Sequence, residues 1–142
     1  MVNNSMSKNL SSGLEDYIET IYISSQSGIV LNGAELARKL NISRASVSEA
    51  LSKLISLGLI EYKPYGSIKL TLKGEEKAKT VYSKHGLLKN FFENVLQVSE
   101  KEASENACRI EHIISENILN RIRKLNDYCK SHPEFLKIFD IN

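Results

Sequence analysis

Several residue types and patterns are scarce in this chain of 142 residues. Its two cysteines, Cys108 and Cys129, are too few for a disulfide framework, so we expect a reducing, cytoplasmic location. No run of about 18 apolar residues occurs, and we therefore expect no membrane span. Residues 1–13 lack the apolar core of a signal peptide and are expected to form a flexible tail. Internal repeats and low-complexity segments are also absent.

The stretch from Asn32 to Ile60 is the most informative part of what the sequence does contain. Its apolar residues recur at three- and four-residue steps in two blocks, which predicts two short helices joined by a tight turn. These residues are Leu36, Ala37 and Leu40, then Val47, Leu51, Leu54 and Ile55. Ser43 stands where it can cap the second helix. Such a pair is typical of a helix-turn-helix, whose second helix presents its N-terminal end to the DNA major groove.

The residues that follow predict a two-stranded wing. Gly58 suits the left-handed position that ends a helix. Residues 60–63 alternate as a strand does, Lys63-Pro64-Tyr65-Gly66 has turn chemistry with proline in second place, and residues 67–72 return as a second strand. Helix, turn, helix and hairpin in this order indicate a winged helix-turn-helix. The alternative is a small helical domain that happens to carry a hairpin.

Helices are predicted on both sides of this segment. They cover residues 14–24, 72–96, 99–114, a stretch from Ser115, and a short one from His132. The fold class is therefore mainly α, with a winged helix-turn-helix DNA-binding domain over residues 1–74 and an all-helical second domain over residues 75–142. The long helix between them is a candidate for linking the two domains and for dimerisation.

Charge is nearly balanced overall, at a formal +2, but it is unevenly distributed. Residues 33–79 hold nine Lys and Arg against five Asp and Glu, whereas residues 81–142 hold nine of each. The excess of positive charge thus lies on the segment expected to bind DNA, although a surface that only confers solubility would look similar.

Six polar side chains have spacings typical of metal ligands. Cys108, Glu111 and His112 are three and four residues apart, and Asp16 and Glu19 are three apart, so each set is expected on one helical face. His85 is the sixth, within a largely apolar stretch. Mixed oxygen, nitrogen and sulfur donors suit a first-row divalent ion. The alternatives stay open: first-turn helix acids, a core histidine and a small buried cysteine would give the same residues.

Taken as a whole, the chain resembles the diphtheria toxin repressor family of metal-dependent transcription regulators over nearly all of residues 12–130. The resemblance lies in several short motifs in the same order. They are residues 15–22 (EDYIETIY), 46–48 (SVS), 70–74 (LTLKG), 84–88 (KHGLL) and 107–112 (ACRIEH).

This resemblance implies a regulatory metal site at Asp16, Glu19, His85, Cys108, Glu111 and His112. Asp16 and Glu19 resemble the manganese-sensing branch, whereas Cys108 resembles the iron-sensing branch, so the implied cofactor is Mn²⁺ or Fe²⁺. Lys89 and Ser104 stand where the iron-type ancillary site would have an acid and a histidine. The sequence is similar to the compact two-domain form, without the SH3-like domain of longer members.

The implied function is a homodimeric repressor that binds an operator in double-stranded DNA, with metal-uptake genes as targets. Two recognition helices one helical turn apart must meet two half-sites, which requires a dimer. The candidate DNA-binding residues are Ser43, Arg44, Ser46, Ser48, Glu49, Lys63, Tyr65 and Lys69. Arg44 can reach a guanine edge or a phosphate, and the wing residues are expected to touch the backbone or to be merely solvated.

Two other functions fit parts of the sequence. One is a winged-helix regulator that does not respond to metal, in which the polar cluster is structural. The other is a small metallohydrolase that uses Glu111 and His112 at an open metal position, but no His-Glu-x-x-His signature supports it. We therefore expect no enzymatic activity.

Overall fold

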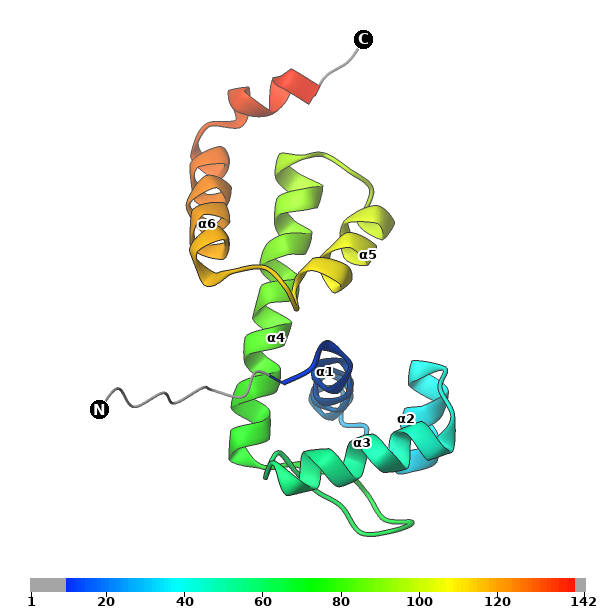
Figure 1. Cartoon of the computed structure of the whole chain (residues 1–142). Helices are drawn as coiled ribbons and strands as arrows, with labels where there is room; N and C mark the ends of the chain where they lie inside the picture. The colour runs from blue at the N-terminus through cyan, green and yellow to red at the C-terminus, as the bar shows by residue number, and fades with distance from the viewer. Residues whose placement is uncertain (1–9, 140–142) are drawn as a thin grey trace, which may run out of the picture. The chain divides into compact units, whose positions relative to one another are not determined.

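The computed structural model describes residues 10–139, and its chain divides between Lys79 and Thr80 into two compact units. The first unit contains α1 (Ser12–Gln26), α2 (Gly33–Leu40), α3 (Arg44–Ser56), β1 (Ile60–Glu61) and β2 (Lys69–Leu70). Helix α4 (Leu72–Asn90) begins in the first unit and ends in the second (Figure 1). Residues 1–9 of the expected tail lie outside the described residues, whereas Leu10 packs against the first core.

Serine and asparagine side chains begin the helices of the first unit. Ser11 caps α1, and the Ser43 Oγ accepts a hydrogen bond from the Ser46 amide at 3.1 Å to cap α3. Asn32 forms a capping box with Glu35 at the start of α2, in which each side chain accepts from the other residue's amide at 2.9 and 2.8 Å. Asn41, with φ of 53°, ends α2 in the left-handed conformation. These local signals explain why two short helices form here.

One apolar core holds the first unit together. The predicted stripes of α2 and α3 contribute Leu36, Ala37, Val47, Leu51 and Leu54, all buried. Ile55 was predicted to belong to the same apolar stripe, but 44% of its surface is exposed and it lies outside the core. Gly58 has the expected positive φ, 70°, and turns the chain out of α3.

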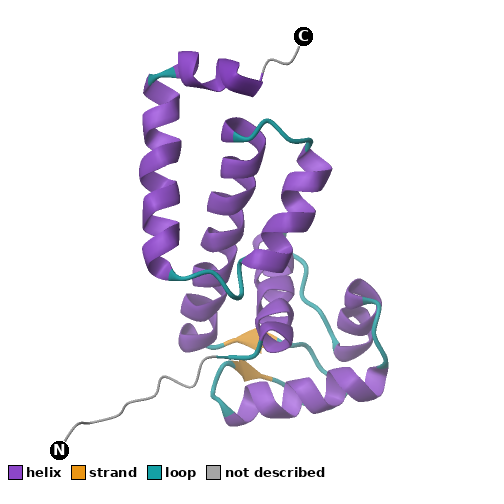
Figure 2. Cartoon of the chain, turned by 45° about the horizontal axis from the view of Figure 1, so that its top comes forward, coloured by secondary structure: helices purple, strands orange, loops and turns teal. Residues whose placement is uncertain are grey.

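The wing is shorter than predicted. Its two strands pair antiparallel only at Ile60 with Leu70 and at Glu61 with Lys69 (Figure 2). A further isolated bridge joins Ser67 to Asn32, at the start of α2. The residues between the strands therefore form a loop that is attached to α2 instead of a longer ladder.

Close backbone contacts attach the start of α4 to the end of α3. The Thr71 amide donates to the Leu59 carbonyl at 3.0 Å, and the Thr71 hydroxyl donates to the Gly58 carbonyl at 2.6 Å. The Lys73 ammonium donates to the Leu57 carbonyl at 3.1 Å. Gly74 is buried directly against Leu59, and a Cβ on it would overlap the Leu59 carbonyl oxygen.

The second unit has helices and no strand among its described residues. It contains the π-helical turn η1 (Phe91–Val95), α5 (Glu100–Ile110), α6 (Glu116–Ser131) and the 3₁₀ helix η2 (Pro133–Phe139). In Figures 1 and 2, α5 and α6 flank the end of α4 and η1, and η1 contacts both. Leu88, Ala107 and Leu119 form the buried centre of this arrangement.

The helical segment predicted over residues 72–96 is confirmed, and one other predicted helix end in this unit was wrong. The segment is α-helical to Asn90 and continues as the π-helical turn η1 to Val95, where the Leu96 amide bonds five residues back to Phe91. The helix from Ser99 ends at Ile110 instead of Ile114, so Glu111 is its C-cap and His112 lies in the turn beyond it. Across residues 10–139, no helix combines the length and the apolar character that crossing a membrane requires.

Candidate metal centre and DNA-binding surface

Glu111 is the centre of a polar cluster in the second unit. Its side chain is fully buried, and its Oε2 lies 2.7 Å from Nδ1 of His85 on α4. Its Oε1 lies 3.5 Å from Nε2 of His112, whose side chain is 7% exposed. The Cys108 Sγ lies 3.7 Å from the same His85 Nδ1. Four of the six predicted ligands are thus brought together within this unit.

The end of α5 explains how neighbouring residues reach one point. Cys108 is on the last helical turn and exposed, whereas Glu111 caps the helix and His112 follows it. Cys108 and Glu111 keep the predicted helical spacing, because the Glu111 amide still bonds to the Ala107 carbonyl, whereas His112 lies beyond the end of the helix. The turn directs the carboxylate of Glu111 inward, and α4 supplies His85 from the other side.

This cluster fits a divalent metal ion. The Oε1 of Glu111 is buried and forms no hydrogen bond with any described residue. Leaving one oxygen of a buried carboxylate without a hydrogen-bond partner is unfavourable, and a cation would compensate it. A carboxylate, two imidazoles and a thiol are also the donors that first-row transition metals accept. The residues present therefore match the predicted cofactor class.

Asp16 and Glu19 belong to the first unit. They lie three residues apart on α1, where Asp16 is exposed and Glu19 is largely buried. Their spacing places both on one side of the helix, as predicted. Their participation in the metal centre stays a prediction.

Lys89, one of the two residues predicted to depart from an ancillary metal site, forms an ion pair. Lys89, at the end of α4, donates to the Glu100 carboxylate at the start of α5 over 2.9 Å. This hydrogen bond, and then the charge of Lys89, lower the pKa of Glu100, while the same pair raises the pKa of Lys89. Both side chains are engaged with each other instead of standing as ligands.

The predicted DNA-binding residues of α3 lie on its exposed side. Ser43, Arg44, Ser46, Ser48 and Glu49 are all exposed, whereas the opposite side of the helix is buried in the core. The hydroxyl of Ser43 is used to cap the helix and also donates to the Ser46 hydroxyl at 2.9 Å. The first two turns of α3 therefore present short polar side chains and one arginine to solvent.

A cleft of about 230 Å³ separates the start of α3 from the wing. It brings together Arg44, Ser48 and Tyr65 among the predicted residues. Lys63 is exposed on the same loop but does not line the cleft, and Lys69 lines a separate hollow with Glu75. The remaining lining residues are Asn32, Gly33, Ala34, Val47, Leu51 and Tyr62.

Tyr62 and the start of α2 were missed as parts of this surface. Tyr62 belongs to the alternating pattern after α3, which predicts a strand but does not reveal which neighbour the ring will meet. Its hydroxyl comes within 3.3 Å of where a Cβ on Gly33 would lie, so the absence of a side chain at Gly33 permits this approach. The Asn32–Ser67 bridge, which brings α2 and the wing together, could not be found from periodicity.

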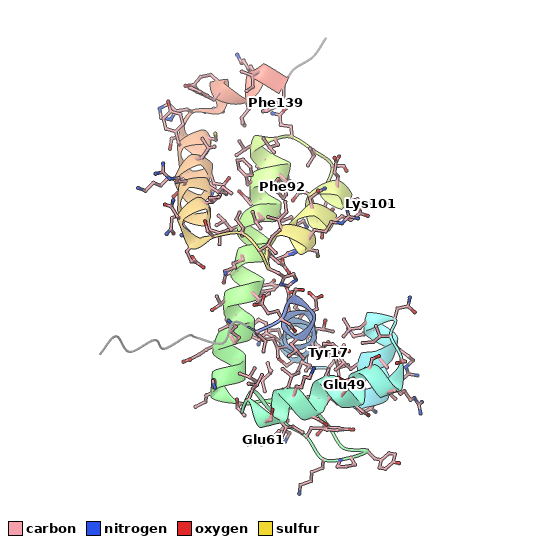
Figure 3. All side chains as sticks on the ribbon, viewed as in Figure 1. Tyr17, Glu49, Glu61, Phe92, Lys101 and Phe139 are labelled. Atoms are coloured by element: carbon pink, nitrogen blue, oxygen red, sulfur yellow. The ribbon has the colours of Figure 1, made fainter. Side chains whose placement is uncertain are left out.

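Tyr17 on α1 lies close enough to Glu49 on α3 for their charges to interact. Figure 3 labels Tyr17 on α1 and Glu49 on α3, whose side chains approach each other within the first unit. Burial, and secondarily the charge of Glu49, raise the pKa of Tyr17. The residue next to Asp16 is therefore electrostatically coupled to a predicted DNA-binding residue.

A winged helix-turn-helix with an adjoining helical unit that carries a metal-ligand cluster defines a class, the metal-dependent DNA-binding regulators. Two family models match the chain: the iron dependent repressor N-terminal DNA binding domain over residues 9–68, and the iron dependent repressor metal binding and dimerisation domain over residues 71–140. The chain therefore belongs to the iron dependent repressor family.

Relatives agree with this assignment. An uncharacterized HTH-type transcriptional regulator of Methanocaldococcus jannaschii is 41% identical over 80% of this chain and 92% of its own length. The transcriptional regulator MntR of Lysinibacillus sphaericus is 30% identical over 87% of this chain and 88% of its own. The iron-dependent repressor IdeR of Mycobacterium leprae is 32% identical over 84% of this chain, but only 52% of its own length is covered.

Solved structures give the same result. The manganese regulator SloR superposes with a TM-score of 0.71 at 31% identity, covering 81% of this chain and 54% of that one. A manganese-dependent transcriptional repressor in complex with manganese superposes with a TM-score of 0.75 at 27% identity, covering 81% and 53%. The chain thus spans about half the length of these two proteins.

These findings confirm the predicted family, the fold class and the function of a metal-responsive, DNA-binding repressor with a dimerisation domain. The matched metal binding and dimerisation domain also confirms a metal as the cofactor, while its identity as Mn²⁺ or Fe²⁺ stays a prediction. The relatives named above are transcription regulators, not enzymes; that this chain has no enzymatic activity stays a prediction.

Proposed function

We propose that this protein represses transcription when Mn²⁺ or Fe²⁺ is bound by a single regulatory centre. The proposed ligands are Asp16, Glu19, His85, Cys108, Glu111 and His112. The observation that carries the proposal is the cluster around the buried Glu111, whose second oxygen has no hydrogen bond within the described chain. Family membership supports the assignment of these residues to metal binding.

The division of the ligands between the two units suggests how the metal acts. His85, Cys108, Glu111 and His112 are contributed by the unit named for metal binding and dimerisation, whereas Asp16 and Glu19 are on α1 of the DNA-binding unit. In the absence of a cation the carboxylates repel one another and leave α1 poorly positioned. Ligation by both units would fix the separation of the two recognition helices in the dimer, so the metal favours the DNA-competent state by its higher affinity for that state.

On DNA, each protomer of the dimer would place the start of α3 in the major groove of one half-site. Arg44 is proposed to contact a guanine edge or a phosphate, and Ser43, Ser46 and Ser48 permit close approach of the helix. We propose that Glu49 faces the same groove. Lys63, Tyr65 and Lys69 are proposed to contact the backbone.

We propose that the DNA-binding domain ends at residue 74 and that the metal-binding and dimerisation domain follows it. The proposed targets are metal-uptake genes, and the proposed site of action is the cytoplasm. No enzymatic activity is proposed.

A paired substitution tests the metal assignment. DNA duplexes are first selected from a random-sequence pool by the wild-type protein with Mn²⁺, and binding is then measured across Mn²⁺ and Fe²⁺ concentrations and with EDTA. The double variant Glu111→Ala/His112→Ala should lose metal-stimulated binding. Because coupling free energies of 1–3 kcal/mol are typical, the lost stimulation should be about 5- to 150-fold.

The matched control replaces the same residue types outside the cluster. Glu105→Ala/His132→Ala removes an exposed glutamate on α5 and the histidine that stacks on Tyr128, and should remain metal-responsive. If the Glu111 and His112 variant responds to metal as the control does, the assigned centre is wrong. If the wild type binds equally with and without EDTA, the alternative of a metal-independent winged-helix regulator is correct.

A further inference from the structure

The turn at the tip of the wing holds an aromatic residue in a backbone conformation that it rarely adopts. The Gly66 amide donates to the Lys63 carbonyl at 2.8 Å and closes a four-residue turn with Pro64 in second place. Tyr65, in third place, has φ of 61°. Glycine or asparagine normally occupies such a position because a side chain is unfavourable there. Tyrosine is therefore a costly choice for this turn.

The side chain of Tyr65 makes no contact within residues 10–139 that compensates that cost. Tyr65 is 101% exposed, and it forms no hydrogen bond with another described residue. Its ring packs on no core cluster, although Tyr62 beside it does. Backbone strain of this kind clusters at functional sites, which suggests that another molecule contacts Tyr65.

The position of the ring suggests which molecule this is. Tyr65 and Tyr62 line the cleft next to α3 together with Arg44 and Ser48. The lining offers one guanidinium, hydroxyl groups and no acidic side chain, and its apolar part includes the buried Val47 and Leu51. A cation with hydroxyl donors suits a phosphate, and an aromatic face suits the apolar side of a deoxyribose.

We propose that the cleft between α3 and the wing clamps the sugar-phosphate backbone of one DNA strand, with Tyr65 packed on a sugar and Tyr62 and Arg44 bonded to a phosphate. Tyr62 is thereby assigned as a DNA contact, and the strained conformation of Tyr65 is retained because it directs the ring to the strand. This inference rests on the proposed DNA-binding function and adds to it how the register of α3 in the groove is set.

The test separates strain from contact by using substitutions that have opposite effects on stability and binding. Tyr65→Gly and Tyr65→Asn should raise the midpoint of thermal unfolding, because both residues accept a positive φ. The same variants, as full-length dimers with saturating Mn²⁺, should bind the selected duplex about tenfold more weakly, as expected when a ring loses its packing against DNA. Hydroxyl-radical cleavage should show a protected sugar in the wild-type complex that is lost with Tyr65→Gly.

Three further variants make the assignment specific. Tyr65→Phe should retain most affinity if the ring packs on a sugar, whereas Tyr62→Phe should lose affinity because its hydroxyl is the bonding group. Arg44→Ala should lower the slope of binding against salt concentration by about one, while Tyr65→Gly should leave that slope unchanged. Gln97→Gly is the matched control: it relieves a positive φ of 56° in the second unit and should change no DNA affinity.

The outcomes are distinguishable. If the wild type fails to bind the duplex with metal, the proposed function itself has failed. If the wild type binds and Tyr65→Gly binds equally well with the same footprint, the clamp is overturned. If Tyr65→Gly lowers the unfolding midpoint, the strain argument is wrong, and if Tyr62→Phe binds like the wild type, Tyr62 is not a contact.

Discussion

At the scale of single residues, Gly74 shows how little space separates α4 from the end of α3. A Cβ at this buried position would overlap the Leu59 carbonyl oxygen, which also accepts the Thr71 amide. Gly74→Ala should therefore destabilise the protein by about 2 kcal/mol, because overpacking against backbone cannot be relieved by a rotamer change. Thermal or urea unfolding measures this loss.

Gly13→Ala is the control for that substitution. Gly13 also lies in a helix, but nothing is within 4 Å of a Cβ at this position. Alanine there should be neutral or stabilising by up to about 1 kcal/mol, because glycine is a poor helix former. Equal destabilisation by both substitutions would contradict the packing argument.

The Lys89–Glu100 pair predicts a pH-dependent effect of a surface ion pair. Its hydrogen bond lowers the pKa of Glu100, so its contribution to stability is present above the ordinary pKa of a carboxyl group and is lost as pH falls through the lowered value. Glu100→Gln should therefore lower the unfolding midpoint slightly near neutral pH, and the difference from the wild type should vanish in acid. Both groups are exposed, so added salt should also reduce it.

An NMR titration of the Glu100 carboxyl group checks this directly. Lys89→Met should return its pKa toward the ordinary value, whereas Lys101→Met, which removes a neighbouring charge that does not pair with Glu100, should change it little. A midpoint difference that persists unchanged into acid would show that Glu100→Gln acts by some other route.

At the scale of elements, the N-cap of α3 combines folding and DNA binding in one side chain. The Ser43 Oγ accepts from the Ser46 amide at 3.1 Å, so Ser43→Ala should cost about 1 kcal/mol of stability. Ser43→Asp retains the cap and hence most of the stability, but its negative charge should repel DNA phosphates and weaken binding. Ser43→Asn retains the cap without the charge and serves as the control. Unfolding midpoints and duplex binding separate the two roles, and equal DNA affinity of the Asp and Asn variants would argue against a close approach to phosphate.

Elements with strong local signals were predicted well from the sequence. Ser43 and Ser115 cap helices at the positions where the sequence predicted helix starts, and Gly58 has the predicted positive φ. These features depend on bonds between residues a few positions apart, which the order of residue types reveals.

Elements that depend on contacts between distant residues were predicted less well. Helix α5 ends at Ile110, and no glycine or proline near that position marks the end in the sequence. The π-helical hydrogen bond from Leu96 to Phe91 adds one residue to a turn without changing its apolar pattern. Ile55 fits the stripe of α3 but lies at the end of the helix, beyond the core.

The candidate site was predictable in its composition but not in its geometry. His85, Cys108, Glu111 and His112 were all named from spacing and resemblance, and the second unit brings them together. The cleft beside α3 was not foreseen. Its lining includes Asn32 and Tyr62, which are thirty positions apart in the sequence and come together only because the wing packs beside α2. Spacing along one helix predicts which residues are neighbours on that helix, whereas a cleft between two elements can be located only once the packing of those elements is known.

At the scale of the whole molecule, binding the metal and changing DNA affinity in response to it are separate properties. Four ligands belong to the second unit, so that unit should hold a divalent ion even when α1 contributes nothing. Asp16 and Glu19 are the ligands through which the DNA-binding unit would sense the ion. Asp16→Asn/Glu19→Gln should therefore still bind Mn²⁺, with lower affinity, while its DNA affinity no longer depends on the metal.

Calorimetric titration and duplex binding, compared at metal concentrations that saturate each variant, measure the two properties separately. A metal at 100 times its dissociation constant stabilises a protein by about 2.7 kcal/mol, so the variant should still show a rise in its unfolding midpoint under these conditions. Its stimulation of DNA binding should fall to less than about twofold, below the 5-fold lower end of typical allosteric coupling. Glu15→Gln, on the same helix, controls for the loss of a negative charge. Undiminished stimulation in the Asp16 and Glu19 variant would mean that the second unit alone transmits the signal, through its dimerisation instead of through α1.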